Sequence, residues 1–159
     1  MTFRAERFQG TESYEDITGA HAENGVTGPQ LGLVEHLVAD EAAGVAPEDL
    51  ELVELHDCFA TAELRHYDNL RLCPEGGAGE WIDRRGLWRG GEIPVSVCGG
   101  LLSKGHPSGG TGIGNIYEVT TRLRGEAGDR QIEGARVGLT HAIGLGSACA
   151  VHIVEKAAA

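Results

Sequence analysis

The chain alternates between segments of helical apolar spacing and short apolar runs typical of buried strands. Residues 29–42 and 60–70 place apolar side chains at helical spacing, and the run at residues 50–55 between them predicts a buried strand. Strands are also predicted over residues 93–97, 137–142 and 149–154, and a helix over residues 113–123. Alternation of helices and strands in this order indicates a layered α/β fold, in which the last two strands form a hairpin.

The size of the chain fits one such unit. Its 159 residues, 41% of them hydrophobic, are enough for a single domain with its own core. Aromatic residues make up only 5%, so aliphatic side chains and alanine must fill that core. We interpret residues 1–28 as an N-terminal strand and loop, and residues 29–156 as the domain.

Charge and cysteine content exclude several functions. A formal net charge of −11 argues against binding to nucleic acid or to an anionic membrane, because both require basic surface. The sequence has no apolar run long enough to span a membrane and no apolar segment typical of a secretion signal. The four cysteines are widely spaced without a Cys-x-x-Cys pair, so we expect no metal site, and reduced thiols in the cytoplasm.

One candidate site follows the buried strand at residues 50–55. It is the motif His56-Asp57-Cys58-Phe59, at a position where open α/β sheets bind ligands. His56 and Cys58 could share such a site. Alternatively, Cys58 is a small buried hydrophobic residue and Asp57 caps the helix that follows.

A second candidate is Gly105-His106-Pro107, within a glycine-rich loop predicted over residues 99–112. Pro107 restricts His106 to extended geometry and the glycines allow a substrate to approach, so His106 is a candidate general base. The alternative is an exposed histidine in a flexible loop. A phosphate-binding loop is excluded because Lys104 precedes His106 instead of ending the motif.

A third candidate is the turn from Gly144 to Gly146, which alone is ordinary hairpin chemistry. Taken in order with the other two, however, it resembles the C-terminal domain of thiolases. The His-Asp-Cys-Phe form is similar to the subgroup related to sterol carrier protein x, the lipid-transfer-protein thiolases. The resemblance implies one βαβαβαββ half, with a five-stranded mixed sheet flanked by helices.

The resemblance also implies roles for individual residues. His106 would activate a nucleophilic cysteine, Cys58 would move the proton at the substrate α-carbon, and His56 would order an oxyanion-hole water. Residues 105, 107, 144 and 146 (Gly105, Pro107, Gly144 and Gly146) would shape the substrate pocket. A coenzyme A thioester would be the substrate, with no bound cofactor and no metal.

The nucleophilic cysteine of thiolases belongs to their N-terminal half, which this sequence lacks. The resemblance therefore implies a hetero-oligomeric acyltransferase, active only with a partner chain that carries the nucleophile. One alternative is a subunit of a retro-aldolase acting on acyl-CoA, with a zinc-binding OB-fold protein as partner. Another is a non-catalytic remnant of the fold.

Overall fold

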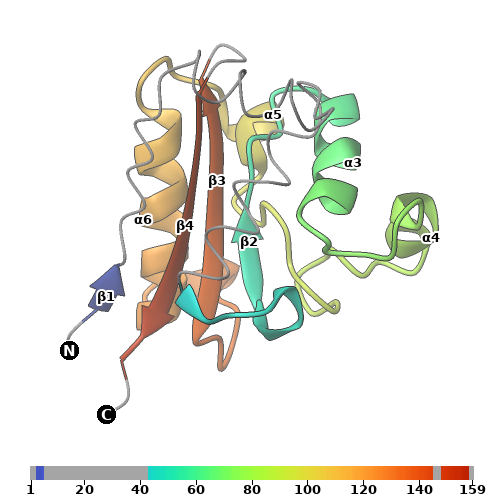
Figure 1. Cartoon of the computed structure of the whole chain (residues 1–159). Coiled ribbons are helices and arrows are strands. Elements are labelled where there is room, and N and C mark those ends of the chain that lie inside the picture. Colours follow the sequence, from blue (N-terminus) through green and yellow to red (C-terminus); the bar gives the residue numbers. More distant parts are fainter. Residues whose placement is uncertain (1–2, 6–42, 145–147, 158–159) are drawn as a thin grey trace.

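The computed structural model describes residues 3–5, 43–144 and 148–157, and these form a sheet with helices on both faces (Figure 1). The strands are β1 (Phe3–Ala5), β2 (Leu52–Glu54), β3 (Val137–Gly144) and β4 (Ala148–Lys156). The α-helices are α3 (Ala60–Asn69), α4 (Ala78–Asp83), α5 (Gly100–Lys104) and α6 (Thr111–Arg124), and the short 3-10 helices are η2 (Pro47–Asp49) and η3 (Gly128–Arg130). The α/β class expected from the sequence is confirmed.

The sheet is mixed, with strand order β1-β4-β3-β2. β3 and β4 form the predicted antiparallel hairpin, β1 pairs antiparallel with β4, and β2 runs parallel to β3. The strand predicted over residues 93–97 is reduced to one parallel bridge between Val95 and Val53. Pro94 has no N–H to donate and Ser96 has φ +45°, so neither neighbour of Val95 can extend the strand. The described residues therefore form four strands, and the predicted fifth is not confirmed.

Helix α6 covers one face of the sheet through a small apolar cluster. Leu52 and Val154 lie on either side of Gly138 in the strand register. A Cβ at position 138 would lie 2.7 Å from Cγ1 of Val119, so only glycine lets the helix approach this closely. The cluster comprises Leu52, Val119, Leu123, Ala135 and Val154.

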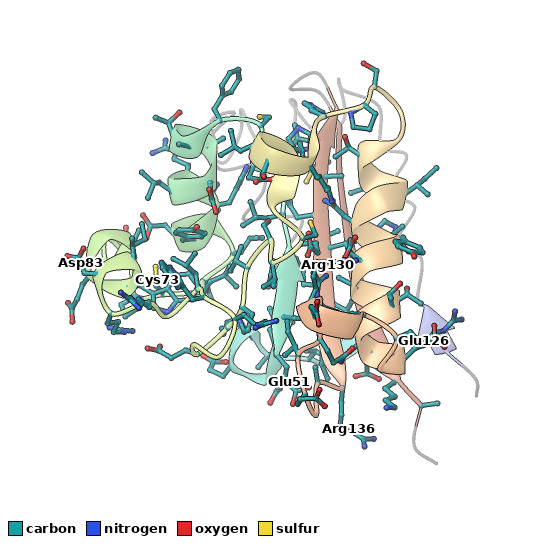
Figure 2. All side chains as sticks on the ribbon, turned by 180° about the vertical axis from the view of Figure 1, so that it is seen from behind. Glu51, Cys73, Asp83, Glu126, Arg130 and Arg136 are labelled. Carbon is teal, nitrogen blue, oxygen red and sulfur yellow. The ribbon has the colours of Figure 1, made fainter. Side chains whose placement is uncertain are left out.

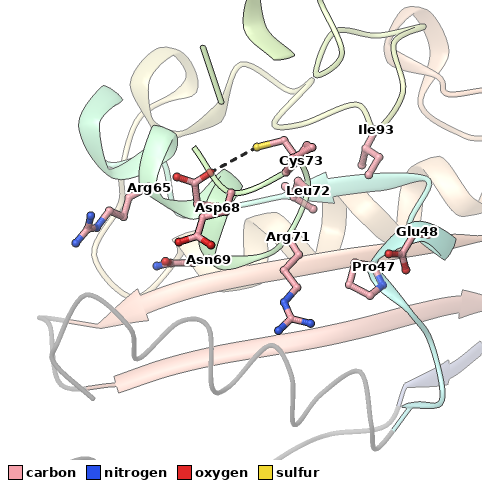
Figure 3. A pocket seen from close by; sticks show the side chains of 11 residues that line it. Pro47, Glu48, Arg65, Asp68, Asn69, Arg71, Leu72, Cys73 and Ile93 are labelled. Carbon is pink, nitrogen blue, oxygen red and sulfur yellow. Dashed lines mark hydrogen bonds between the residues drawn. The ribbon is translucent and has the colours of Figure 1, made fainter. Parts of the chain in front are cut away.

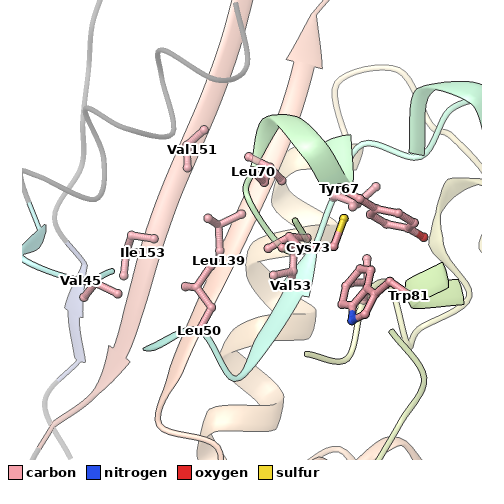
Figure 4. Close-up of a cluster of buried hydrophobic side chains, with 13 residues drawn as sticks. Val45, Leu50, Val53, Tyr67, Leu70, Cys73, Trp81, Leu139, Val151 and Ile153 are labelled. Carbon is pink, nitrogen blue, oxygen red and sulfur yellow. The ribbon is translucent and has the colours of Figure 1, made fainter. Parts of the chain in front are cut away.

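The opposite face carries a larger core beneath α3 and α4 (Figure 4). Trp81 is completely buried there and meets the ring of Tyr67 edge to face, with centroids 5.1 Å apart. Aliphatic side chains from the strands complete this core, including Val53, Leu139 and Ile153. The long polar excursion over residues 73–92 thus contributes α4 and its tryptophan to the core.

Two further predictions concern the glycine-rich loop and the N-terminal part of the chain. The glycine-rich loop predicted over residues 99–112 contains a helix, α5, and α6 begins at Thr111, two residues before the predicted start. The helix predicted over residues 29–42 and most of the N-terminal segment lie outside the described residues, as does Gly146. Among the helices that are described, none has the length and apolarity needed to cross a membrane.

Candidate functional site

The two histidines predicted to share a site lie against each other beyond the end of β2. His56 follows β2 by two residues and is buried, whereas His106 lies in the exposed loop between α5 and α6. Their ring centroids are 4.8 Å apart and the planes are almost perpendicular. Burial lowers the pKa of His56, the nearby His106 lowers it further, and Asp57 partly opposes both. His56 is therefore held as a neutral imidazole near neutral pH.

The hydroxyl of Thr111 lies within hydrogen-bonding distance of the His106 ring. The Thr111 hydroxyl donates to the Pro107 carbonyl at 3.1 Å, and its oxygen lies 2.7 Å from Nδ1 of His106. The hydroxyl has only one hydrogen, so when it donates to the Pro107 carbonyl it accepts from Nδ1–H of His106. The neutral ring then carries its lone pair on Nε2, which is the arrangement that a general base requires.

Asp57 connects the end of β2 to α5. Its carboxylate accepts a hydrogen bond from the Leu101 N–H at 2.8 Å, at the first turn of α5. Gly100 has φ +58°, and a Cβ at this position would overlap the Asp57 carboxylate. The alternative in which Asp57 caps the next helix is wrong, because α3 begins after Phe59 without a side-chain cap. Asp57 instead caps a helix 44 residues further along the chain.

Of the remaining predicted residues, Cys58, Gly105 and Pro107 lie next to the two histidines in the sequence, and Gly144 ends β3. Cys58 is half-buried. Gly105, with φ +102°, ends α5, and Pro107 precedes the first turn of α6. A Cβ at Gly112 would lie 3.6 Å from Cβ of Ala142, so this turn of α6 packs beside β3, which ends at Gly144.

Two further histidines, His66 and His141, form a second buried pair near this site. His66 of α3 meets His141 of β3 with ring centroids 4.5 Å apart, and both are buried. Burial lowers the pKa of His66 to about 4, with a further contribution from His56. The sequence contained one signal for this: His66 lies four residues before Leu70, on the face of α3 that turns inward.

A surface pocket lies apart from the two histidines, beside α3 and η2 (Figure 3). Its volume is about 810 Å³, and its walls come mainly from α3, from η2 and from the segment after α3. The lining residues are Pro47, Glu48, Arg65, Asp68, Asn69, Arg71, Leu72, Cys73, Pro74, Glu75 and Ile93. Two arginines are outnumbered by three carboxylates, so its charge does not favour an anionic ligand. Burial and the neighbouring Asp68 raise the pKa of Cys73 to about 11, which makes its thiol a poor nucleophile. The described residues also contain no cluster of three metal-binding side chains.

The fold and the order of these motifs define the protein's class. Residues 37–156 match the family model described as thiolase C-terminal domain-like, which covers most of the chain. The chain therefore belongs to the thiolase C-terminal domain-like family, as the sequence motifs predicted.

Individual relatives agree with this assignment. Over 111 residues the chain is 50% identical to sterol carrier protein 2 of Rattus norvegicus, covering 70% of this chain and 20% of that protein. It is 43% identical over 119 residues to an acetyl-CoA acetyltransferase of Methanothermobacter thermautotrophicus, covering 74% and 31%. An Ltp2-ChsH2(DUF35) aldolase shares the fold, with a TM-score of 0.70 at 24% identity over 78% of this chain and 31% of that one. The chain thus spans about a fifth to a third of the relatives it matches.

Proposed function

We propose that this domain supplies the acid and base groups for acyl transfer to or from coenzyme A thioesters, with the nucleophilic cysteine on a partner chain. The domain would comprise residues 29–156. The observation that carries the proposal is the contact between His56 and His106, with Nδ1 of His106 at 2.7 Å from the Thr111 hydroxyl oxygen and Cys58 two residues from His56. The family to which the chain belongs, and its similarity to an acetyl-CoA acetyltransferase, support the same chemistry.

In the thiolytic direction, His106 takes the proton from the partner's thiol. The resulting thiolate attacks the keto carbon of a 3-ketoacyl-CoA. The bond between the keto carbon and the α-carbon then breaks, and the Cys58 thiol gives a proton to the α-carbon, which releases acetyl-CoA and leaves the shortened acyl group on the partner's cysteine. A free coenzyme A thiol next gives its proton to the Cys58 thiolate and takes the acyl group, which forms the shortened acyl-CoA and frees the partner's cysteine. Both steps develop an oxyanion, and neutral His56 is suited to hold a water that donates a hydrogen bond to it.

A partner chain is also favoured by the outer side of α6. Ile113 and Tyr117 are 71% and 62% exposed, and Ile116 lies one turn from Ile113. Figure 2 views the molecule from this side and shows side chains projecting outward from the helix. Apolar side chains at helical spacing on an exposed face are typical of a protein interface. We therefore propose that the nucleophile-bearing half packs on this face, in a hetero-oligomer located in the cytoplasm.

The test uses this chain reconstituted with the nucleophile-bearing half, assayed for cleavage of a 3-ketoacyl-CoA. His106→Asn is expected to lower kcat by about 10²- to 10⁴-fold, the range for removal of a general base. Because His106 is exposed, the thermal midpoint of the variant should stay near that of the wild type. Unchanged turnover would leave the domain a structural role only.

A parallel assay with a 3-hydroxyacyl-CoA separates acyl transfer from retro-aldol cleavage. The structural likeness to the aldolase concerns the fold alone. Cleavage of the 3-hydroxyacyl-CoA without cleavage of the 3-ketoacyl-CoA would exclude the proposed reaction in favour of the aldolase.

A further inference from the structure

Helix α5, which leads directly into His106, is anchored by the side chain of Lys104. The Lys104 ammonium donates to Sγ of Cys98 at 3.1 Å and to Oδ1 of Asn115 at 3.4 Å. It also lies 4.0 Å from Oε2 of Glu54. The last residue of a five-residue helix is thus attached to the sheet, to α6 and to the segment that precedes α5.

The carboxylate of Glu54 connects Lys104 to the sheet. Glu54 is 1% exposed, and its carboxylate forms an ion pair with Arg122 of α6 at 2.8 Å and accepts a hydrogen bond from the Cys98 thiol at 2.8 Å. Burial raises the pKa of Glu54, and the arginine, the lysine and the thiol oppose that effect. Burial and the carboxylate also raise the pKa of Cys98, so this thiol acts as a hydrogen-bonding link between Lys104 and Glu54.

Asn115, which accepts a hydrogen bond from Lys104, connects α6 to two strands. Its amide is completely buried and donates to the backbone carbonyls of His141 at 3.2 Å and Glu54 at 3.5 Å. It therefore ties α6 to both β2 and β3, where these strands lie side by side. Thr111, which holds the His106 ring, lies one turn earlier on the same helix. The two attachments of His106, through α5 and through α6, meet at Lys104 and Asn115.

We propose that Lys104 is a positioning residue that sets the imidazole of His106 against His56, acting through Cys98, Glu54 and Asn115. Glu54 lies two residues before His56 in the chain, so the hydrogen-bond network of Lys104 and the His56 ring are both fixed to the end of β2. Lys104 itself need not touch substrate. This inference rests on the proposed function for its catalytic consequence, but its structural content can be tested without activity.

The test compares Lys104→Met with Lys104→Arg, and with Lys156→Met as a matched control. Lys156 is the other lysine of the chain and lies in β4. The first measurement is NMR of the full chain labelled with ¹⁵N-histidine, alone and with its partner. In the wild type we expect one Nδ1–H tautomer of His106 and a cross-relaxation signal between the His56 and His106 rings. Lys104→Met should halve that signal or mix the tautomers, whereas Lys104→Arg and Lys156→Met should retain both.

The second measurement is kinetic, with the reconstituted complex. Lys104→Met should lower kcat about tenfold with KM unchanged, because a misplaced base affects the chemical step rather than binding. Lys104→Arg should restore most of that loss. Wild-type ring signals in Lys104→Met would overturn the inference, and so would a loss of thermal stability in Lys104→Met that Lys104→Arg does not restore. An inactive wild-type complex would refute the proposed function alone, since the NMR comparison still decides the role of Lys104.

Discussion

The two faces of the sheet are stabilised by different physical interactions. The face beneath α3 and α4 holds a large apolar core with Trp81 and Tyr67 at its centre. The α6 face has a small apolar cluster, and beside it the buried ion pair of Glu54 and Arg122. Apolar burial drives folding without directional requirements, whereas a buried ion pair contributes little net stability but requires one geometry.

The difference fits the position of the candidate site. His106 is held from the α6 side, through Thr111 and through the group around Lys104. His66 and His141 lie on the α3 side, within a tightly packed environment. We infer that the α3 face mainly supplies stability and the α6 face mainly supplies geometry. The following predictions test this division.

The largest effect is expected for Trp81→Ala on the α3 face. The indole is completely buried, so its removal leaves a large cavity and should reduce the free energy of unfolding by about 5 kcal/mol. Trp88→Ala is the matched control. Trp88 is 54% exposed, with the Arg85 guanidinium 4.6 Å from its ring centroid, and its loss should cost about 1 kcal/mol or less. Urea unfolding measures the free energy of unfolding of both variants. Equal losses would contradict the conclusion that Trp81 is a central residue of the core.

On the α6 face, Arg122→Met should cost about 3–4 kcal/mol, because it leaves the Glu54 carboxylate buried without its main partner. The double variant Glu54→Gln with Arg122→Met should recover most of that loss, since it removes the buried charge. Arg130→Met is the control. Arg130 shares Glu118 with Arg122 but is half exposed, so its loss should cost less than about 1 kcal/mol. A double variant as unstable as Arg122→Met would show that packing, not charge, dominates this face.

Much of the fold followed from local patterns in the sequence. The helical spacing over residues 60–70 and the apolar run over residues 50–55 gave α3 and β2 with small boundary errors. Gly144 marked the end of β3 in the hairpin. The strand predicted over residues 93–97 failed because β propensity does not include the backbone geometry of Pro94 and Ser96. Glycine content likewise concealed α5, which Asp57 caps from 44 residues away.

The candidate site was predictable only as motifs and not as contacts. The sequence identified His56, Cys58 and His106 separately, and the resemblance to thiolases joined them. The cap from Asp57 to Leu101 and the Lys104 group depend on pairings between distant segments, which no local pattern contains. The burial of His66 was not predicted, because a histidine in a helix gives little sign of whether it is buried.

The smallest predicted effect concerns pH and again separates the two faces. In the folded protein the pKa of His66 is lowered to about 4, below the ordinary value of about 6.5. As pH falls between these values the unfolded chain binds a proton that the native state does not, so the native state loses stability. For His66 alone this loss is about 2 kcal/mol between pH 7 and pH 5. The raised pKa of Glu54 on the α6 face acts in the opposite direction.

His66→Phe should keep the ring packing against His141 but remove this titration. Its free energy of unfolding, from urea curves at pH 7 and pH 5, should fall about 2 kcal/mol less than that of the wild type. An unchanged dependence on urea concentration serves as the control that both proteins unfold to similar states. An equal fall in both proteins would mean that His66 is protonated within the fold. The face assigned to stability would then contain a buried charge, and the contrast between the two faces would disappear.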